Sequence, residues 1–233
     1  MKQTQPQTLR IMGQNIGALR VIVTTVGCVG GLISMEHGIF EILQGNIATN
    51  GLFINAIGPA QRLWEGAGEL AFTIIPNFLI TGIFAVVFGI LGLIWSIAFV
   101  HKRYGSLGLF ILSVIQYLVG GGIAFLIVAI FNSLIATRIN KPFVFLSKML
   151  SLKVRNVLGN LWLWLLPLIA FVITFPIPIF IVIIGVKSMD ASSTEKLAWI
   201  LGDMALVFLI FSIIMGFVHD IKSLDDKEIQ IVS

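Results

Sequence analysis

The topology of this chain depends on residues 105–137, whose sequence is GSLGLFILSVIQYLVGGGIAFLIVAIFNSLIAT. The block is almost wholly apolar, and Gly120, Gly121 and Gly122 stand at its centre. Glycine is a poor helix former and a good turn former. A helix needs about 20 residues to cross the hydrocarbon core, and each half of the block, 105–119 or 123–137, is shorter than that. The block is therefore either one long tilted helix or a helical hairpin that turns at the glycines and returns to its starting side.

The composition of the whole chain is that of a helical membrane protein. Its 233 residues are 58% hydrophobic and 11% charged, with a mean hydropathy of +1.03. A soluble domain has about 25% charged residues, and one as apolar as this could not cover its surface with polar groups. The composition excludes a soluble enzyme, a disordered chain and a nucleic-acid reader. We expect the lipid bilayer as the main partner and no nucleic acid.

Apolar runs on either side of the central block predict four full spans. They cover residues 21–43, 70–100, 161–186 and 197–218, and an outer loop, 44–69, separates the first two. The second run exceeds one crossing, so Pro76 marks either an interfacial start or a kink. With the hairpin, residues 1–233 are expected to form a single all-α polytopic membrane domain of about six membrane helices.

The positions of the basic residues separate the two interpretations of the central block. With a cytoplasmic N-terminus, a hairpin places twelve Lys and Arg residues inside and three outside, namely Arg62, Lys187 and Lys196. A single crossing inverts every later segment and leaves seven inside and eight outside. Because basic loops stay cytoplasmic, the count favours the hairpin, with both termini on the cytoplasmic side of a cell membrane. It does not separate two re-entrant halves from two short full spans.

The segment 138–156 mixes basic and apolar residues, among them Lys148, Met149, Leu152 and Lys153. This pattern is typical of a helix that lies on the inner membrane surface and is attracted to anionic lipid. A plain cytoplasmic linker has the same composition, so both interpretations stay open. Anionic lipid is the partner expected under the first.

Ionisable residues within the spans indicate one candidate site. The first span ends in SMEHGIFEILQ, residues 34–44, where His37 and Glu41 are four residues apart and share a helix face. Glu36 points elsewhere by about 100 degrees. Under the hairpin topology, Asn77 and Asp203 enter the same half of the bilayer from other spans. We therefore expect all five residues in the outer half.

The chemistry of this cluster admits several functions. Carboxylates and an imidazole can transfer protons or bind a cation. The alternative is that these residues lie at the water-exposed end of a helix and have no such role. The sequence favours a small permease or channel-like protein that handles protons or cations. The alternatives are a non-catalytic assembly or sensor subunit and a membrane-embedded enzyme. Cys28 is the single cysteine, which excludes a multi-thiolate metal site, and we assign no catalytic residue and no cofactor.

Small and polar residues within the spans bear on helix packing. Gly27, Gly31 and Gly38 predict a close helix contact, either within the chain or in a homo-oligomer through the first span. Gln116 and Asn132 lie inside the central block, where such residues either line a pore or hydrogen-bond between helices.

Overall fold

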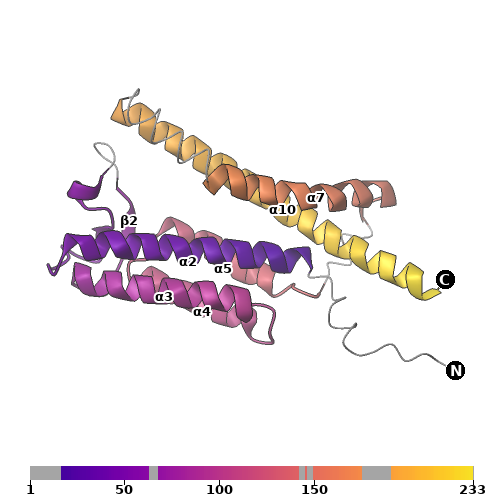
Figure 1. Cartoon of the computed structure of the whole chain (residues 1–233), viewed down its shortest axis with the longest axis horizontal. Coiled ribbons are helices and arrows are strands. Elements are labelled where there is room, and N and C mark those ends of the chain that lie inside the picture. The colour runs from indigo at the N-terminus through magenta and orange to yellow at the C-terminus, as the bar shows by residue number, and fades with distance from the viewer. Residues whose placement is uncertain (1–16, 63–67, 142–144, 146–148, 175–189, 233) are drawn as a thin grey trace.

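The computed structural model describes residues 17–62, 68–141, 145, 149–174 and 190–232. These residues are mostly helical (Figure 1). The described helices longer than one turn are α2 (Ala18–Gln44), α3 (Phe78–Ala98), α4 (Gly105–Leu118), α5 (Ala124–Ala136), α7 (Leu152–Thr174) and α10 (Ala191–Val232). Within the described residues, three helical stretches are long and apolar enough to cross a membrane: Ala18–Gln44, Phe78–Ala98 and Ser192–Ser223. A membrane location is therefore plausible.

A small antiparallel sheet covers the C-terminal end of α2. Its strands are β1 (Phe53–Asn55) and β2 (Leu70–Phe72), with the short 3-10 helix η1 (Pro59–Gln61) between them. Ile54 pairs with Ala71, and both are buried against Phe78 at the start of α3. The predicted outer loop 44–69 thus contains regular structure, and its residues 63–67 lie outside the described part of the chain.

The second predicted span, 70–100, begins too early. Residues 70–72 form strand β2, and the helix α3 begins only at Phe78. Pro76 has no N–H group to donate and disfavours helix in the residue before it. Asn77 then caps the new helix, because its Oδ1 accepts a hydrogen bond from the Ile80 N–H at 3.1 Å. Within residues 70–75, Ala71 and Thr73 are buried, whereas Leu70 and Ile74 are 60% and 57% exposed, so this apolar stretch is a half-exposed strand and loop rather than part of a longer helix.

The helices α4 and α5 are antiparallel neighbours joined by residues 119–123. Trp95, near the end of α3, donates to the Gly105 carbonyl at 2.9 Å, and Thr81, near its start, donates to the Val119 carbonyl at 2.8 Å. α4 therefore runs back along α3. α5 then returns along α2, where Asn132 donates to the Val23 carbonyl at 3.1 Å. The turn adopts φ values of +96° at Gly120 and +92° at Gly122, which residues with a side chain rarely adopt.

The helix pair α2–α3 is held by reciprocal glycine contacts. A Cβ atom at Gly38 would lie 2.5 Å from the Gly82 carbonyl oxygen, and one at Gly82 would lie 2.5 Å from that of Gly38. Gly31 and Gly89 repeat the arrangement at 2.7 Å, and Gly27 faces Ser96. The small-residue face of the first span is therefore covered by α3 of the same chain. A homo-oligomer that uses this face would have to displace α3.

The helices that correspond to the last two predicted spans, 161–186 and 197–218, have different bounds. The helix α7 begins at Leu152, not at residue 161, so residues 152–156 of the segment 138–156 belong to its N-terminal end. Residues 142–144 and 146–148 of that segment, and 175–186 of the predicted span, lie outside the described residues. α10 continues past residue 218 to Val232 because no Gly or Pro follows to end it. Its start is capped by Asp190, which accepts from the Ser193 N–H at 3.0 Å.

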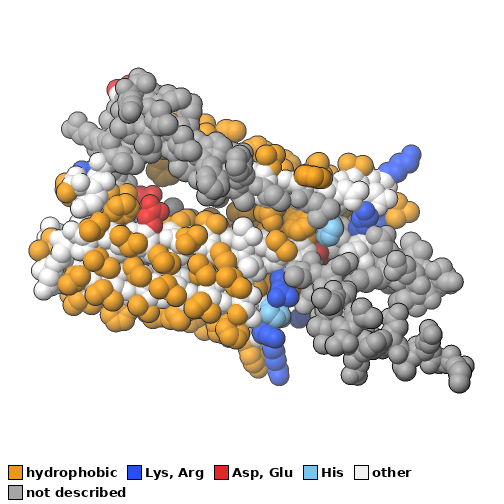
Figure 2. All heavy atoms as spheres, viewed as in Figure 1, with side chains coloured by type: hydrophobic (Ala, Val, Ile, Leu, Met, Phe, Trp, Pro, Cys, Tyr) orange, Lys and Arg blue, Asp and Glu red, His pale blue; other side chains and the backbone are white. Residues whose placement is uncertain are grey.

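One end of the bundle is basic. A buried cluster brings together the start of α2, the end of α3, the start of α4 and the end of α5, through Leu19, Val23, Val100, Leu109, Ala136 and Ile139. The exposed cations Lys102, Arg103 and Lys141 lie in the connections at this end. On the face in Figure 2, most Lys and Arg side chains lie toward this end, while the largest group of acidic atoms lies near the sheet. The bundle thus has a basic end and a sheet end.

Candidate functional site

The buried polar face of α2 packs against the turn 119–123. Ser34, His37 and Glu41 are one or more helical turns apart, and their relative exposures are 1%, 3% and 0%. Three and four residues are the spacings that align side chains on one helix face. All three side chains point at the turn, so the site consists of one helix face and one glycine-rich turn.

Each of these side chains lies against a different glycine of the turn. The carboxylate of Glu41 contacts the position that a Cβ atom at Gly120 would occupy. A Cβ atom at Gly122 would lie 2.7 Å from His37 Cε1 and 3.1 Å from Nδ1. The hydroxyl of Ser34 lies likewise 2.8 Å from the Cβ position of Gly121. The three glycines are therefore needed for this approach as well as for the turn.

Strand β2 holds the turn in place from the other side. The Gly120 N–H donates to the Phe72 carbonyl at 3.0 Å, and the Ile123 N–H donates to that of Leu70 at 3.3 Å. Thr81 Oγ1 is 2.6 Å from Thr73 Oγ1 and donates to the Val119 carbonyl. These bonds make the turn a third, short addition to the sheet, which positions it across the polar face of α2.

Glu69 connects the buried imidazole with the exterior. It immediately precedes β2, and its carboxylate accepts a hydrogen bond from His37 Nε2. The Glu69 side chain is 56% exposed, whereas that of His37 is 4% exposed. The hydrogen bond with His37 holds the pKa of Glu69 below its usual range, although burial acts in the opposite direction. Glu69 is thus an ionised group at the mouth of the site.

Three buried polar atoms of the site have no hydrogen-bond partner among the described residues. They are His37 Nδ1 and both carboxyl oxygens of Glu41. A buried polar atom without a partner costs free energy, and more so in a membrane interior. Glu41 is 0% exposed, and an ionisable side chain that is buried in a membrane span in spite of this cost usually has a function. Glu41 is therefore the most unusual residue of the site.

Two of the other predicted members of the cluster lie near it but do not join it. Glu36 is exposed on another face of α2, although it is close enough to Glu69 and His37 for electrostatic interaction. Asn77 caps α3, and its Nδ2 donates to Asn46 Oδ1 at 2.8 Å. The side chain of Asn77 is thus occupied by loop and helix contacts.

Asp203 has the expected depth but lies on a different surface. It stands 17 residues before Asp220, which caps the first turn of α2 with a 2.6 Å bond from the Ala18 N–H, so it lies roughly 26 Å along α10 at 1.5 Å per residue. Its side chain is exposed, and Figure 1 shows the N-terminal half of α10 turning away from α2. The structure therefore does not bring Asp203 to His37 and Glu41.

The polar residues deeper in the bundle bond to backbone carbonyls of neighbouring helices. Ser34 donates to the Ala85 carbonyl at 3.0 Å, Gln116 to that of Phe88 at 2.9 Å, and Asn132 to that of Val23 at 3.1 Å. Interhelical hydrogen bonding is therefore the role in which the structure shows Gln116 and Asn132. They line no described pore.

Sequence reasoning missed Glu69 as a member of the site. It stands at the junction of the predicted loop and the predicted second span, where a carboxylate is ordinary. One signal was available: a hairpin that returns at the glycines puts its turn at the outer end of the first span, beside the loop that ends at Glu69. No group of three or more His, Cys, Asp or Glu able to hold a metal ion occurs among the described residues.

Comparisons with known proteins found no matching family model, no matching curated protein and no matching solved structure.

Proposed function

We propose that this chain is a small membrane permease or channel-like protein that carries protons, and that His37 and Glu41 form the outer part of its pathway. The observation that carries the proposal is Glu41, a fully buried carboxyl whose two oxygens have no partner among the described residues. An ionised carboxylate is costly in such a place, so the group holds a proton until water or another group reaches it. Taking up and releasing a proton is the chemistry that such a group supports.

The neighbouring imidazole supplies a route from the exterior. His37 Nε2 meets the half-exposed carboxylate of Glu69, and Nδ1 faces the turn at Gly122. An imidazole can accept a proton on one nitrogen and release one from the other. Glu69, His37 and Glu41 thus form a series from a half-exposed side chain to a fully buried one. Further transfer from His37 to Glu41 requires a small movement of the turn or the entry of water.

A proton fits this site better than a metal cation. A hard cation needs several oxygen ligands, and a transition metal needs several nitrogen, sulfur or oxygen ligands. Among the residues that the structure describes, no cluster of three such side chains exists. The buried side chains of Ser34, Gln116 and Asn132 already donate to backbone carbonyl oxygens of neighbouring helices.

The topology that we propose places the sheet end outside and the basic end in the cytoplasm of a cell membrane. It contains four full spans, with the α4–α5 hairpin inserted between them and both termini inside. The exposed Lys102, Arg103 and Lys141 at one end support this orientation because basic loops remain cytoplasmic. The helices α4 and α5 have 14 and 13 residues, fewer than a helix needs to cross the hydrocarbon core. Their lengths favour a hairpin that is packed against α2 and α3 within the membrane.

Proton flux into proteoliposomes tests this function. Full-length protein is reconstituted with a pH-sensitive dye inside, and a potassium gradient with valinomycin drives protons inward. We expect flux well above that of empty vesicles, and at least a tenfold loss in Glu41→Gln, which keeps the shape of the side chain but cannot ionise. Glu36→Gln is the matched control, because Glu36 lies on the same helix and is exposed.

Two outcomes would contradict the proposal. The first is wild-type flux equal to that of empty vesicles at several driving potentials. The second is an equal loss in Glu36→Gln and Glu41→Gln, which would show that the negative charge of this helix end matters and the buried carboxyl does not. Size-exclusion profiles of both variants in detergent establish that each one is folded.

A further inference from the structure

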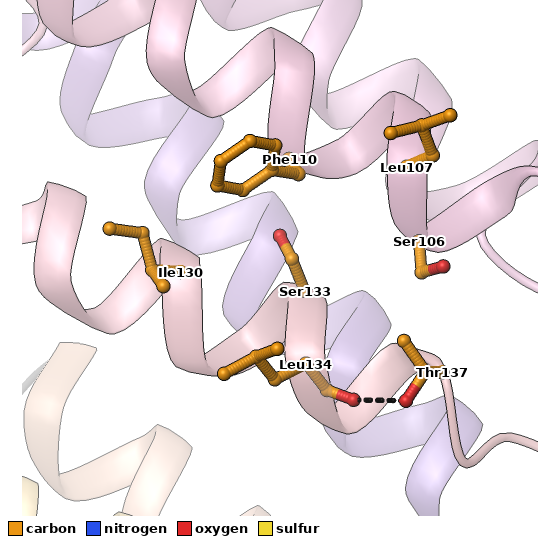
Figure 3. A pocket seen from close by; sticks show the side chains of 7 residues that line it. All are labelled: Ser106, Leu107, Phe110, Ile130, Ser133, Leu134 and Thr137. Carbon is orange, nitrogen blue, oxygen red and sulfur yellow. Dashed lines mark hydrogen bonds between the residues drawn. The ribbon is translucent and has the colours of Figure 1, made fainter.

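A groove between α4 and α5 has the form of a lipid-chain site. Its volume is about 210 Å³, and it is lined by Ser106, Leu107, Phe110, Ile130, Ser133, Leu134 and Thr137. Figure 3 shows these side chains converging from the two helices, with Ser106 and Thr137 at one end and Ile130 at the other. The groove therefore runs from the open end of the hairpin toward its interior.

The lining is more apolar than its composition suggests. Ser133 Oγ donates to the Ala129 carbonyl at 2.8 Å, and Thr137 Oγ1 donates to that of Leu134 at 2.6 Å. Both hydroxyl hydrogens are thus used within α5, and the methyl group of Thr137 is left for contact with an occupant. An acyl chain is suited to such a surface, whereas a polar ligand would lose more hydration than the few hydroxyl oxygens of the lining could replace.

The open end of the groove lies beside a cluster of cations. Ser106 follows the α3–α4 connection, which carries the exposed Lys102 and Arg103, and Thr137 precedes the turn that carries the exposed Lys141. Two separate connections thus bring positive charge to one mouth. The groove has an apolar interior and a cationic mouth. These features match the acyl chain and the negatively charged headgroup of an anionic phospholipid.

We propose that this groove binds one anionic phospholipid, with an acyl chain between α4 and α5 and the phosphate group at Lys102, Arg103 and Lys141. The site is independent of the proton pathway, because it lies at the basic end of the hairpin and the pathway lies at its turn. It also differs from general attraction of the segment 138–156 to the membrane surface, because it combines a defined chain groove with charges from two connections.

Native mass spectrometry of the full chain in detergent tests the site. Phosphatidylglycerol and phosphatidylcholine with identical acyl chains are added separately, and bound lipid is counted. We expect one phosphatidylglycerol to be retained more tightly than phosphatidylcholine. Each cation near an anionic headgroup contributes about fivefold in affinity. The variant Lys102→Gln/Arg103→Gln/Lys141→Gln should therefore bind phosphatidylglycerol only as well as phosphatidylcholine, whereas Arg62→Gln, at the sheet end, should behave as wild type.

A second pair of variants tests the groove itself. Leu134→Trp places a larger side chain in the groove, and we expect weaker binding of both lipids. Ile127→Trp is the matched control, because Ile127 lies two turns away on α5 with a similar exposure, 62% against 58%, and does not line the groove. Equal effects of the two Trp variants would overturn the proposal.

Other occupants would also be visible in this experiment. Displacement of the lipid by millimolar inorganic phosphate would mean that the mouth binds phosphate alone, and would overturn the assignment of the groove to an acyl chain. A dimer mass in wild type that Leu134→Trp removes would assign the groove to a second copy of the chain instead.

Discussion

At the scale of single residues, the distinctive feature is that three adjacent glycines each lie against one polar side chain of α2. Gly120 lies against Glu41, Gly121 against Ser34, and Gly122 against His37. Substituting Ala at any of these positions would require the polar side chain or the turn to move, and at Gly120 and Gly122 it would also meet an unfavourable φ. One glycine would be enough to end the helix α4. The contacts with α2 explain why three glycines occur in the turn, because each of them leaves room for one polar side chain of α2.

The His37–Glu69 hydrogen bond predicts a pH dependence of stability. Because the folded-state pKa of Glu69 is lowered, ionised Glu69 stabilises the folded state above its unfolded pKa of about 4.3. That contribution disappears as the pH falls through the lowered value. We expect Glu69→Gln to reduce the unfolding temperature at pH 7 and to show a smaller further reduction between pH 7 and pH 3 than wild type. The effect should be modest because the side chain is 56% exposed.

Thermal unfolding in detergent, followed by tryptophan fluorescence, provides the measurement. Glu195→Gln is the control, since Glu195 is exposed on α10 and should leave the pH profile unchanged. A Glu69→Gln profile parallel to that of wild type from pH 7 to pH 3 would contradict the assigned role of this hydrogen bond.

At the scale of elements, the pairing of α2 with α3 determines which glycines matter. Gly38 meets a backbone carbonyl of α3, whereas Gly202 on α10 has nothing within 4 Å of the position of a Cβ atom. Ala is a better helix former than Gly by up to about 1 kcal/mol. The same substitution should therefore have opposite effects at these two positions.

The expected results for the pair are a lower unfolding temperature in Gly38→Ala and an unchanged or higher one in Gly202→Ala. The first variant forces two helix backbones apart, which costs typically about 1–3 kcal/mol, and the second gains helix propensity. Melting in detergent would measure both. A stabilised Gly38→Ala would show that α2 and α3 are not in this close contact.

At the scale of the whole molecule, the arrangement of the connections predicts which segments share a side of the membrane. Cysteine labelling of intact cells in a Cys28→Ala background measures it. We expect Asn50→Cys, at the sheet end, to react with an impermeant maleimide from outside. Tyr104→Cys and Lys153→Cys, before and after the hairpin, should react only after lysis. Labelling of Tyr104→Cys and Lys153→Cys from opposite sides would mean that the central block crosses once.

The apolar composition, the helix break at Gly120–Gly122 and the alignment of His37 with Glu41 could all be predicted from the sequence. These features depend on composition and on local backbone geometry, which neighbouring residues determine. The start of α3 was predicted wrongly because an apolar strand such as residues 70–72 and an apolar helix differ little in hydropathy.

Only the tertiary structure determined which polar groups meet. The bond of Glu69 with His37 spans 32 residues, and the cap that Asp220 places on α2 spans 202. Sequence periodicity describes one helix at a time, so it places Asp203 at the right depth without showing that α10 turns its side chain away from the site. Depth along a helix follows from counting residues, whereas proximity between helices depends on the packing of their side chains, and here the glycine contacts of α2 with α3 and of the turn with α2 determine that packing.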